Sequence, residues 1–220
     1  MAKFVLDNIP FKLDRDQILK SLHIQPEDDD AETLESFIRE AESIGRPRTM
    51  YSVEYIESKG EDYVLLGGIK FTSKILRQNL DSVNRAFPFI ATCGMELEDW
   101  ALSKNDPLEQ YWAFTINQFV LGKASEAVIQ HIKDNHNPGN LAQMNPGSLE
   151  SWPLSEQRNL FALLGDPLKD IGVELTESLL MRPVKTVSGI LFSNDDNYEN
   201  CQLCPRENCP GRRAPFRGNL

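Results

Sequence analysis

Three cysteines near the end of this 220-residue chain are the residues whose type and spacing point most directly to chemistry. Cys201, Cys204 and Cys209 follow the pattern Cys-x2-Cys-x4-Cys, and the fourth cysteine of the chain is Cys93. Thiolates at such spacings hold zinc or iron–sulfur clusters, both of which usually take four protein ligands. The spacing therefore predicts a metal site made of the three tail cysteines. Its fourth ligand would be Cys93, a histidine, an exogenous group or a residue of a second subunit. Free thiols on a loose tail are the alternative.

Other residue types that often serve catalysis are sparse. The chain contains neither a Gly-x-Ser-x-Gly nor a His-Glu-x-x-His motif, so triad hydrolysis and zincin chemistry have no support. His131 and His136 lie five residues apart, a poor spacing for two ligands on one helix, and we expect them on the surface near a helix C-terminus. We also expect Glu98, Asp99 and Glu150 on the solvated surface, as is usual for carboxylates.

Composition and charge exclude several classes of function. The chain has 23 Lys and Arg against 33 Asp and Glu, a formal net charge of −10. This balance argues against a nucleic-acid partner and against an anionic membrane surface. No apolar run approaches the roughly 20 residues of a spanning helix, and the N-terminus has no signal-peptide core. We therefore expect a cytoplasmic protein.

Hydrophobic periodicity predicts an α+β fold with an antiparallel sheet, because strand patterns stand near both ends of the chain with helices between them. The glycine pair Gly67-Gly68 interrupts one strand pattern, which is typical of a bulge or a close backbone approach. Helices are predicted for residues 34–44, 73–83, 95–103, 108–133 and 154–164, and strands for residues 4–6, 50–57, 63–71, 87–94, 173–178, 179–181 and 184–192.

Two Asn-Pro-Gly turns lie in the irregular stretch of residues 137–153. Such a long loop in a compact domain is either an ordinary surface loop or a binding loop. We expect residues 1–192 to form one domain and residues 193–220 to form a Cys-rich C-terminal tail.

The second of these turns carries a resemblance to a known family. The run Gln143–Ser148, with Trp152-Pro153 and the helix after it, is followed by Gly-Val-Glu-Leu-Thr-Glu-Ser at 172–178, Met-Arg-Pro at 181–183 and Ser-Gly-Ile-Leu-Phe-Ser at 188–193. In this register the chain resembles the activation (reactivation) domain of vitamin B12-dependent methionine synthase. The segment 89–98 and the long helix after it resemble stand-alone forms of that domain.

The resemblance implies a twisted antiparallel sheet with flanking helices. It also implies a groove that binds S-adenosylmethionine through an Arg-x-x-Pro-Gly-Tyr turn, at the positions of Gln143, Asn145, Pro146, Gly147 and Ser148. The partner implied is a corrinoid-binding protein or methyltransferase that carries the cobalamin. There the domain supports reductive methylation of the cobalt, with a flavoprotein or ferredoxin-type protein as electron donor.

This chain departs from the family pattern at both ends of the turn. Gln143 stands where the family has Arg, and Ser148 stands where it has Tyr. Gln cannot supply the charged fork that Arg offers to a carboxylate, and Ser has no aromatic face. Pro146 and Gly147 remain, so we expect the turn itself to be kept.

Three hypotheses follow. The chain is an accessory protein that supports corrinoid-dependent methyl transfer, or a non-catalytic docking module that has lost the S-adenosylmethionine site. In the third hypothesis it is a redox protein whose cysteine tail binds an iron–sulfur cluster or zinc.

Overall fold

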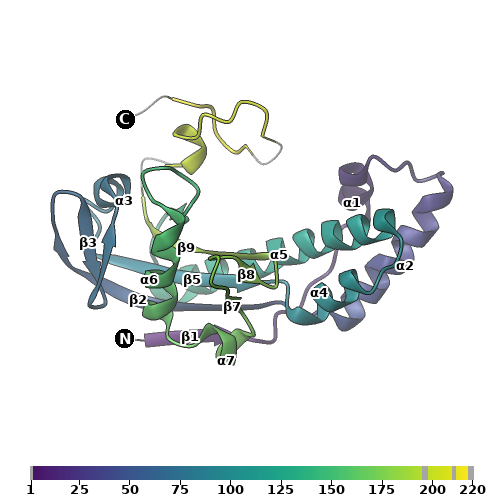
Figure 1. The fold of residues 1–220 in the computed structure, drawn as a ribbon, viewed down its shortest axis with the longest axis horizontal. Coiled ribbons are helices and arrows are strands. Elements are labelled where there is room, and N and C mark those ends of the chain that lie inside the picture. Colours follow the sequence, from purple (N-terminus) through teal and green to yellow (C-terminus); the bar gives the residue numbers. More distant parts are fainter. Residues whose placement is uncertain (1, 195–197, 210–211, 218–220) are drawn as a thin grey trace.

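A curled antiparallel sheet with helices on both faces forms the body of the molecule, in agreement with the predicted α+β class (Figure 1). The structure, a computed structural model, describes residues 2–194, 198–209 and 212–217. The seven strands of the sheet run in the order β4-β3-β2-β5-β9-β6, and β1 pairs with β2. The strands are β1 (Ala2–Leu6), β2 (Arg48–Lys59), β3 (Tyr63–Leu66), β4 (Ile69–Thr72), β5 (Arg85–Thr92), β6 (Leu141–Met144) and β9 (Thr186–Ser193), with a separate two-stranded ribbon of β7 (Glu174–Leu175) and β8 (Met181–Arg182).

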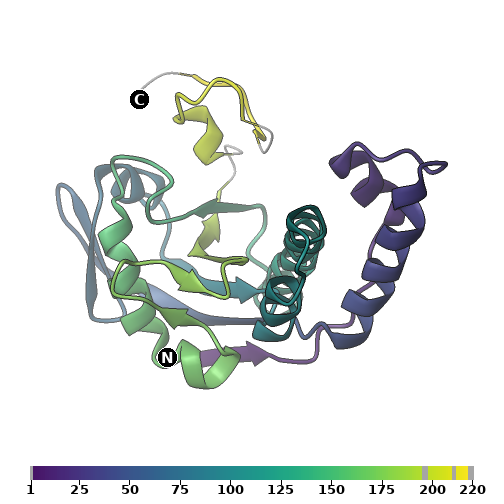
Figure 2. The same cartoon turned by 45° about the vertical axis from the view of Figure 1, so that its right-hand side comes forward.

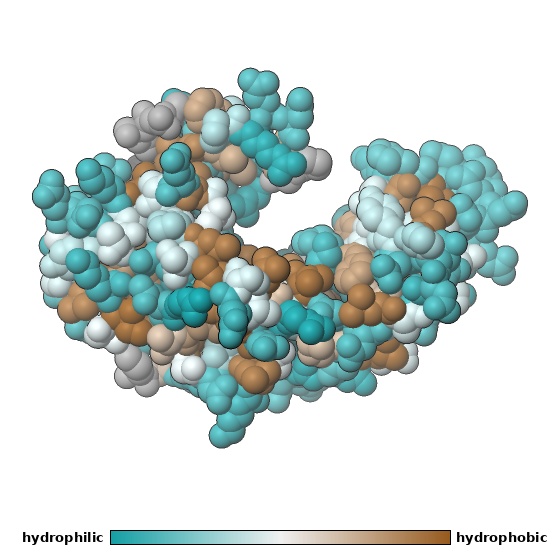
Figure 3. Space-filling model, in the orientation of Figure 1, coloured by the Kyte–Doolittle hydropathy of each residue, from teal (hydrophilic) through white to brown (hydrophobic). Residues whose placement is uncertain are grey.

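The helices divide into two groups, one on each face of the sheet. They are α1 (Arg15–Leu22), α2 (Asp29–Ile44), α4 (Met95–Leu102) and α5 (Pro107–His136) on one face, and α3 (Lys74–Asn79), α6 (Gln157–Leu164) and α7 (Pro167–Ile171) on the other, with short 3-10 turns η1 (Leu154–Glu156) and η2 (Asn200–Gln202). In Figure 2, α1 and α2 form an arm that extends beyond α4 and α5, away from the sheet. The space-filling view shows the molecule hollowed on the side between the arm and the C-terminal tail, its concave side (Figure 3).

The sheet is buried on both faces because its central strands are apolar at successive positions. In β5, Phe87 and Phe89 pack into the core shared with α5, whereas Ala86 and Ile90 pack into the core under α6. This alternation follows from the two-residue period of a strand. A buried Phe contributes about 1.5–3 kcal/mol, so the two cores together fix the position of β5 and of the strands beside it.

The glycine pair at 67–68 forms a turn, not the predicted interruption of one strand. Leu66 pairs with Ile69, and Gly67 and Gly68 have φ angles of 57° and 77°. Positive φ at both central residues is typical of a two-residue hairpin turn, which glycine adopts without steric cost. The predicted strand 63–71 is therefore the hairpin of β3 and β4.

The long helix α5 extends past both predicted ends. Asp106 begins it by accepting hydrogen bonds from the backbone N–H groups of Leu108 and Glu109, at 2.8 and 3.1 Å. Asn137 ends it in the left-handed conformation. Within the described residues, no helix is long and apolar enough to cross a membrane.

The two histidines lie near the C-terminus of α5 as predicted, but they are half-buried and contact a buried side chain, which the prediction of surface residues does not include. His131 Nδ1 and His136 Nε2 lie 2.9 and 3.0 Å from the hydroxyl oxygen of Tyr51, a fully buried residue of β2. Phe4 of β1 stacks on the Tyr51 ring at 4.8 Å between centroids. This aromatic cluster joins the first strand, the sheet and the end of the long helix.

Protonation of His136 should weaken the fold as the pH falls. Burial, followed by the positive charges of Arg85 and His131, lowers the pKa of His136 in the folded state. The unfolded chain therefore takes up this proton first, and stability is lost as the pH falls from about 7 toward the lowered pKa. We expect the free energy of unfolding in urea to fall between about pH 7.5 and 5.5, by about 1.4 kcal/mol for each unit of lowering.

His136→Gln should flatten this pH dependence because Gln does not titrate. His23, which is exposed and lies away from the cluster, supplies the matched control His23→Asn, which should keep the full dependence. An unchanged slope in the His136→Gln variant would contradict the assignment.

Candidate functional site

The Asn-Pro-Gly turn at 145–147 directly follows β6 and is fixed by its own backbone. The Ser148 N–H donates to the Asn145 carbonyl at 3.2 Å, and the Gly147 N–H donates to the Trp152 carbonyl at 2.8 Å. Gly147 has a φ of 79°, which a type II turn requires at this position. Trp152 is fully buried and holds the far side of the turn in the core. The predicted irregular stretch 137–153 therefore contains a sheet strand followed by a structured turn.

A glycine on the neighbouring strand lets this turn approach β9 closely. A Cβ atom on Gly189 would lie 2.4 Å from the Met144 carbonyl oxygen and 2.7 Å from Asn145 Nδ2. In the space thus left open, Asn145 Nδ2 donates to the Ser188 carbonyl at 2.7 Å. The glycine at 189 and the amide at 145 together fix the turn on the edge of the sheet.

A groove of about 420 Å³ opens beside the turn. Its walls come from the turn, from the start of α6, from the loop before and after β8, and from β9. The lining residues are Asn145, Pro146, Ser148, Leu154, Gln157, Leu179, Leu180, Met181, Val184, Thr186, Val187 and Ser188. A cavity of this size is within the range of small-molecule sites, and its apolar walls with a few polar groups are typical of them.

Every residue that lines the groove is uncharged. Gln143, the residue at the family's arginine position, does not line it. Its Nε2 atom donates to Asn145 Oδ1 at 3.1 Å, so the amide contacts a residue that lines the groove. The groove thus offers amide, hydroxyl and backbone groups to a ligand, and these recognise neutral polar atoms better than a carboxylate.

The loop that forms one wall of the groove has a conformation imposed by hydrogen bonds. The Thr176 N–H donates to the Leu180 carbonyl at 2.9 Å, and the Leu179 N–H donates to the Thr176 carbonyl at 3.0 Å. Leu179 has a φ of 67°, a left-handed conformation that is unusual for a bulky side chain. Leu180 and Val184 remain largely exposed, at 63 % and 56 %, so the rim of the groove is apolar.

Glu98 anchors this wall to helix α4, although the sequence predicts a solvated carboxylate there. Glu98 is 2 % exposed, and its carboxylate accepts hydrogen bonds from the Val184 N–H and from Arg182 Nε. The Arg182 Nε atom lies 3.2 Å from Glu98 Oε1. Because a buried carboxylate needs its hydrogen-bond donors, these two contacts fix the groove wall relative to α4.

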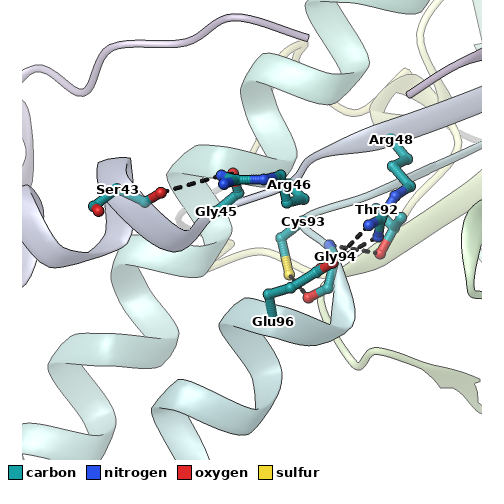
Figure 4. A network of polar contacts seen from close by, with 8 residues as sticks. All are labelled: Ser43, Gly45, Arg46, Arg48, Thr92, Cys93, Gly94 and Glu96. Atoms are coloured by element: carbon teal, nitrogen blue, oxygen red, sulfur yellow. Dashed lines mark hydrogen bonds and ion pairs between the residues drawn. The ribbon is translucent and has the colours of Figure 1, made fainter. Parts of the chain in front are cut away.

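The start of α4 is in turn held against β2 by the polar network of Figure 4. Arg48 donates two hydrogen bonds to the Glu96 carboxylate, at 2.5 and 3.2 Å. Burial raises the pKa of Glu96, but the hydrogen bonds and charge of Arg48 outweigh it and the pKa is lowered. Gly94 begins the helix with a φ of 95°, and a Cβ there would meet the Arg46 carbonyl oxygen at 2.5 Å. The orientation of Glu98 is thereby set from the sheet.

The tail that follows β9 is organised by one guanidinium group. Arg212 donates to the carbonyl oxygens of Cys201, Cys204 and Ala214, at 2.9, 3.1 and 3.2 Å, and also to that of Arg206. The three tail cysteines are partly buried and unpaired. A backbone hydrogen bond from Arg213 is the main reason that the pKa of the Cys201 thiol is lowered.

The described part of the chain contains no group of three His, Cys, Asp or Glu side chains placed to hold a metal ion. The arrangement therefore gives no support to the iron–sulfur or zinc site that the cysteine spacing suggests. Cys93 lies in the core between the sheet and α5, and burial raises the pKa of its thiol to about 12. Cys204, in contrast, packs against the opposite core. As metal ligands, Cys201, Cys204, Cys209 and Cys93 stay a prediction.

The five predicted ligand-binding residues fall at the groove in different ways. Asn145, Pro146 and Ser148 line it, Gly147 shapes the turn, and Gln143 donates a hydrogen bond to Asn145. Sequence reasoning missed the opposite wall, which consists of Leu154, Gln157, Leu179, Leu180, Met181, Val184, Thr186, Val187 and Ser188. The short strand pattern around residue 181 gives no local sign that it faces the turn.

Residues Asp134–Gly139 spell Asp-x-His-x-x-Gly, the signature of corrinoid-binding domains. The structure places this run at the end of α5, where His136 Nε2 is already within hydrogen-bond distance of the buried Tyr51 hydroxyl. The imidazole nitrogen that would ligate cobalt is thus engaged inside the protein. This arrangement gives no support to a corrinoid site at the run.

Comparison with known proteins shows which domains this fold is similar to. Residues 148–209 match the family model described as the vitamin B12 dependent methionine synthase activation domain. Among solved structures, the chain is similar to a crystal structure of the MetH reactivation domain bound to AdoHcy. The TM-score is 0.62 at 14 % sequence identity, with 90 % of this chain and 80 % of that chain covered. Comparison with curated proteins finds no match.

These matches confirm both the predicted resemblance and the predicted fold class. The chain has the fold of the methionine synthase reactivation domain, and its residues 148–209 carry the sequence pattern of the activation-domain family. The matched segment contains every lining residue of the groove except Asn145 and Pro146.

Gly189→Ala should displace the turn and lower the free energy of unfolding. The added methyl group cannot be placed without moving β6 and Asn145, so we expect a loss of about 1–3 kcal/mol in the free energy of unfolding. Gly122 in α5 has nothing within 4 Å of a Cβ, and Gly122→Ala is the matched control. The control should gain about 0.5–1 kcal/mol from helix propensity. Equal stability of the Gly189→Ala variant and the native chain in urea would refute the close approach.

Proposed function

We propose that this chain is an accessory protein of corrinoid-dependent methyl transfer. It supports reductive reactivation of cobalamin carried by a partner, a corrinoid-binding protein or methyltransferase, and acts in the cytoplasm. The observation that carries the proposal is the groove beside the Asn-Pro-Gly turn, which lies where the family resemblance implies the ligand turn.

In this proposal the groove holds S-adenosylmethionine. Its volume and its mix of apolar walls with Asn145, Gln157 and Ser148 suit an uncharged nucleoside, whereas no lining side chain supplies a charge for the amino-acid end. Bound S-adenosylmethionine would supply the methyl group to reduced cobalt on the partner, with an electron from a flavoprotein or ferredoxin-type donor. The part of this chain is to bind and orient the ligand.

The concave side of the molecule suits a docking role. Figure 3 shows apolar side chains along this side, and Leu180 and Val184 on the groove rim are among the exposed large hydrophobic residues. Exposed apolar surface of this kind often marks a protein-binding site. A partner seated there would close over the groove and exclude water from the ligand.

The proposed activity can be tested with a B12-dependent methionine synthase that lacks its own reactivation domain. With S-adenosylmethionine and a reduced flavoprotein, the full chain should restore conversion of cob(II)alamin to methylcobalamin, followed by absorbance. Gly147→Ala should reduce this rate at least about tenfold, because a Cβ at 147 would lie 3.2 Å from Leu154 Cβ and would displace this lining residue of the groove.

The matched control for backbone strain is Gly139→Ala. Gly139 also has a positive φ, 73°, but nothing lies within 4 Å of a Cβ there, and it is outside the groove. The proposal fails if the native chain gives no methylcobalamin with any corrinoid partner, or if both variants lose activity equally.

Restoring the family's arginine should change ligand preference selectively. Gln143→Arg is expected to tighten S-adenosylhomocysteine binding by about tenfold, the effect of one charge-assisted contact to a carboxylate. Methylthioadenosine has no carboxylate and should bind with unchanged affinity, which makes it the matched control ligand in calorimetric titration.

Two outcomes would argue against this view of the groove. An equal gain for both ligands would mean that the arginine acts through the fold. Absence of binding by either ligand to the native chain and to Gln143→Arg would favour the docking module without an S-adenosylmethionine site. The uncharged lining is the observation that keeps this second function open.

A further inference from the structure

The cysteine tail is not used by the proposed function, yet part of it is firmly placed. Leu203 and Cys204 pack against the core under α6, and the Arg217 N–H donates to the Gln202 carbonyl at 2.8 Å. This stretch, which begins at η2, is therefore attached to the body of the protein.

Two of the tail cysteines lie at the ends of one tight turn. The Cys204 N–H donates to the Cys201 carbonyl at 3.4 Å, the i to i+3 contact of a turn. The Cα atoms at the ends of such a turn lie within about 7 Å of each other, and a disulfide needs about 4.4–6.8 Å. A bond between the two sulfur atoms thus needs side-chain rotation and little backbone movement.

Arg212 holds both ends of this turn through its guanidinium group. Its guanidinium group contacts the carbonyl oxygens of both Cys201 and Cys204, at 2.9 and 3.1 Å. One rigid group therefore holds both cysteine backbones. Such pre-organisation raises the effective concentration of one thiol at the other.

The surroundings distinguish the attacking thiol from the resolving one. Cys201 Sγ accepts a hydrogen bond from the Arg213 N–H at 3.4 Å, and the Arg213 side chain is paired with Glu199 at 2.9 Å. A donor aimed at sulfur favours the thiolate, which is the reactive form. Cys204 lies at the other end of the turn, where it packs against the core under α6.

We propose that Cys201 and Cys204 form a redox-active dithiol that exchanges with low-molecular-weight disulfides. The Cys201 thiolate attacks one sulfur of the disulfide RSSR, the S–S bond of RSSR breaks, and one RS⁻ leaves and is protonated. The Cys204 thiolate then attacks Cys201 Sγ in the mixed disulfide and releases the second RS⁻. The sum is one dithiol oxidised to an intramolecular disulfide and one RSSR reduced to two RSH, with the two thiol protons ending on the products.

The test uses the full chain, reduced and then incubated with oxidised glutathione. Mass spectrometry should show a loss of two hydrogens, and non-reducing peptide mapping should place the bond between Cys201 and Cys204. Cys204→Ser should stop after the first step and accumulate one glutathionyl group on Cys201. Cys201→Ser should react at least about tenfold more slowly than the native chain.

Cys209→Ser is the matched control, because it removes a thiol from the same tail but not from the turn. It should form the same internal disulfide at the native rate. The fully buried Cys93 should remain unmodified in every variant. A second variant, Arg212→Lys, keeps the charge but not the fork, and should shift the equilibrium in a glutathione buffer toward the dithiol by about tenfold.

Three results would overturn the proposal. One is a stable mixed disulfide on native Cys201 with no internal bond, and another is a bond that joins Cys209 in preference to Cys204. The third is stoichiometric zinc or iron in anaerobically purified protein that is lost in both Cys201→Ser and Cys209→Ser, because the thiols would then be metal ligands.

Discussion

The close approach of β6 to β9 is the contact on which the candidate site depends. Strand β6 is the edge of the sheet, and its last residue is directly followed by the turn that forms the groove. Because Gly189 has no side chain, the Met144 carbonyl and the Asn145 side chain can lie against the β9 backbone. Any larger residue would separate the turn from Ser188, which also lines the groove. The absence of a Cβ atom at Gly189 therefore allows the turn and β9 to lie close enough to line the same groove.

The positions of β6 and β9 are fixed because the sheet is buried on both faces. Strands β5 and β9 have apolar side chains in each of the two cores, so neither can slide without exposing residues on both sides. Helix α4 is fixed to the same sheet by Arg48 and Glu96, and it presents Glu98 to the loop on the far wall of the groove. The groove is thus bounded by elements attached to one rigid frame, although its residues lie far apart in the sequence.

Local features of this site could be predicted from sequence, whereas its long-range contacts could not. The turn at 145–148 is encoded by Pro146 and Gly147 themselves, and the long helix by its periodic apolar face. Glu98 looks like a surface carboxylate because its partner Arg182 lies 84 residues away in the chain. The contact of His131 and His136 with Tyr51 is not predicted for the same reason, since nothing near them in the sequence indicates Tyr51. Strand β6 is not predicted from the sequence because only four residues form it. The prolines and glycines on either side of it favour the prediction of a loop.

The burial of Glu98 also explains why the groove is neutral despite an arginine beside it. Arg182 follows the lining residue Met181 in the sequence, and its side chain is about half exposed, at 49 %. Its charge, however, compensates a carboxylate that is only 2 % exposed. Glu98 accepts from Arg182 through the Nε atom and also from the Val184 N–H, so both groups of this loop are fixed to a buried carboxylate. Arg182 is not among the residues that line the groove. The contact that positions the groove wall therefore also holds the neighbouring arginine at Glu98, and the groove lining stays uncharged although position 143 has no arginine.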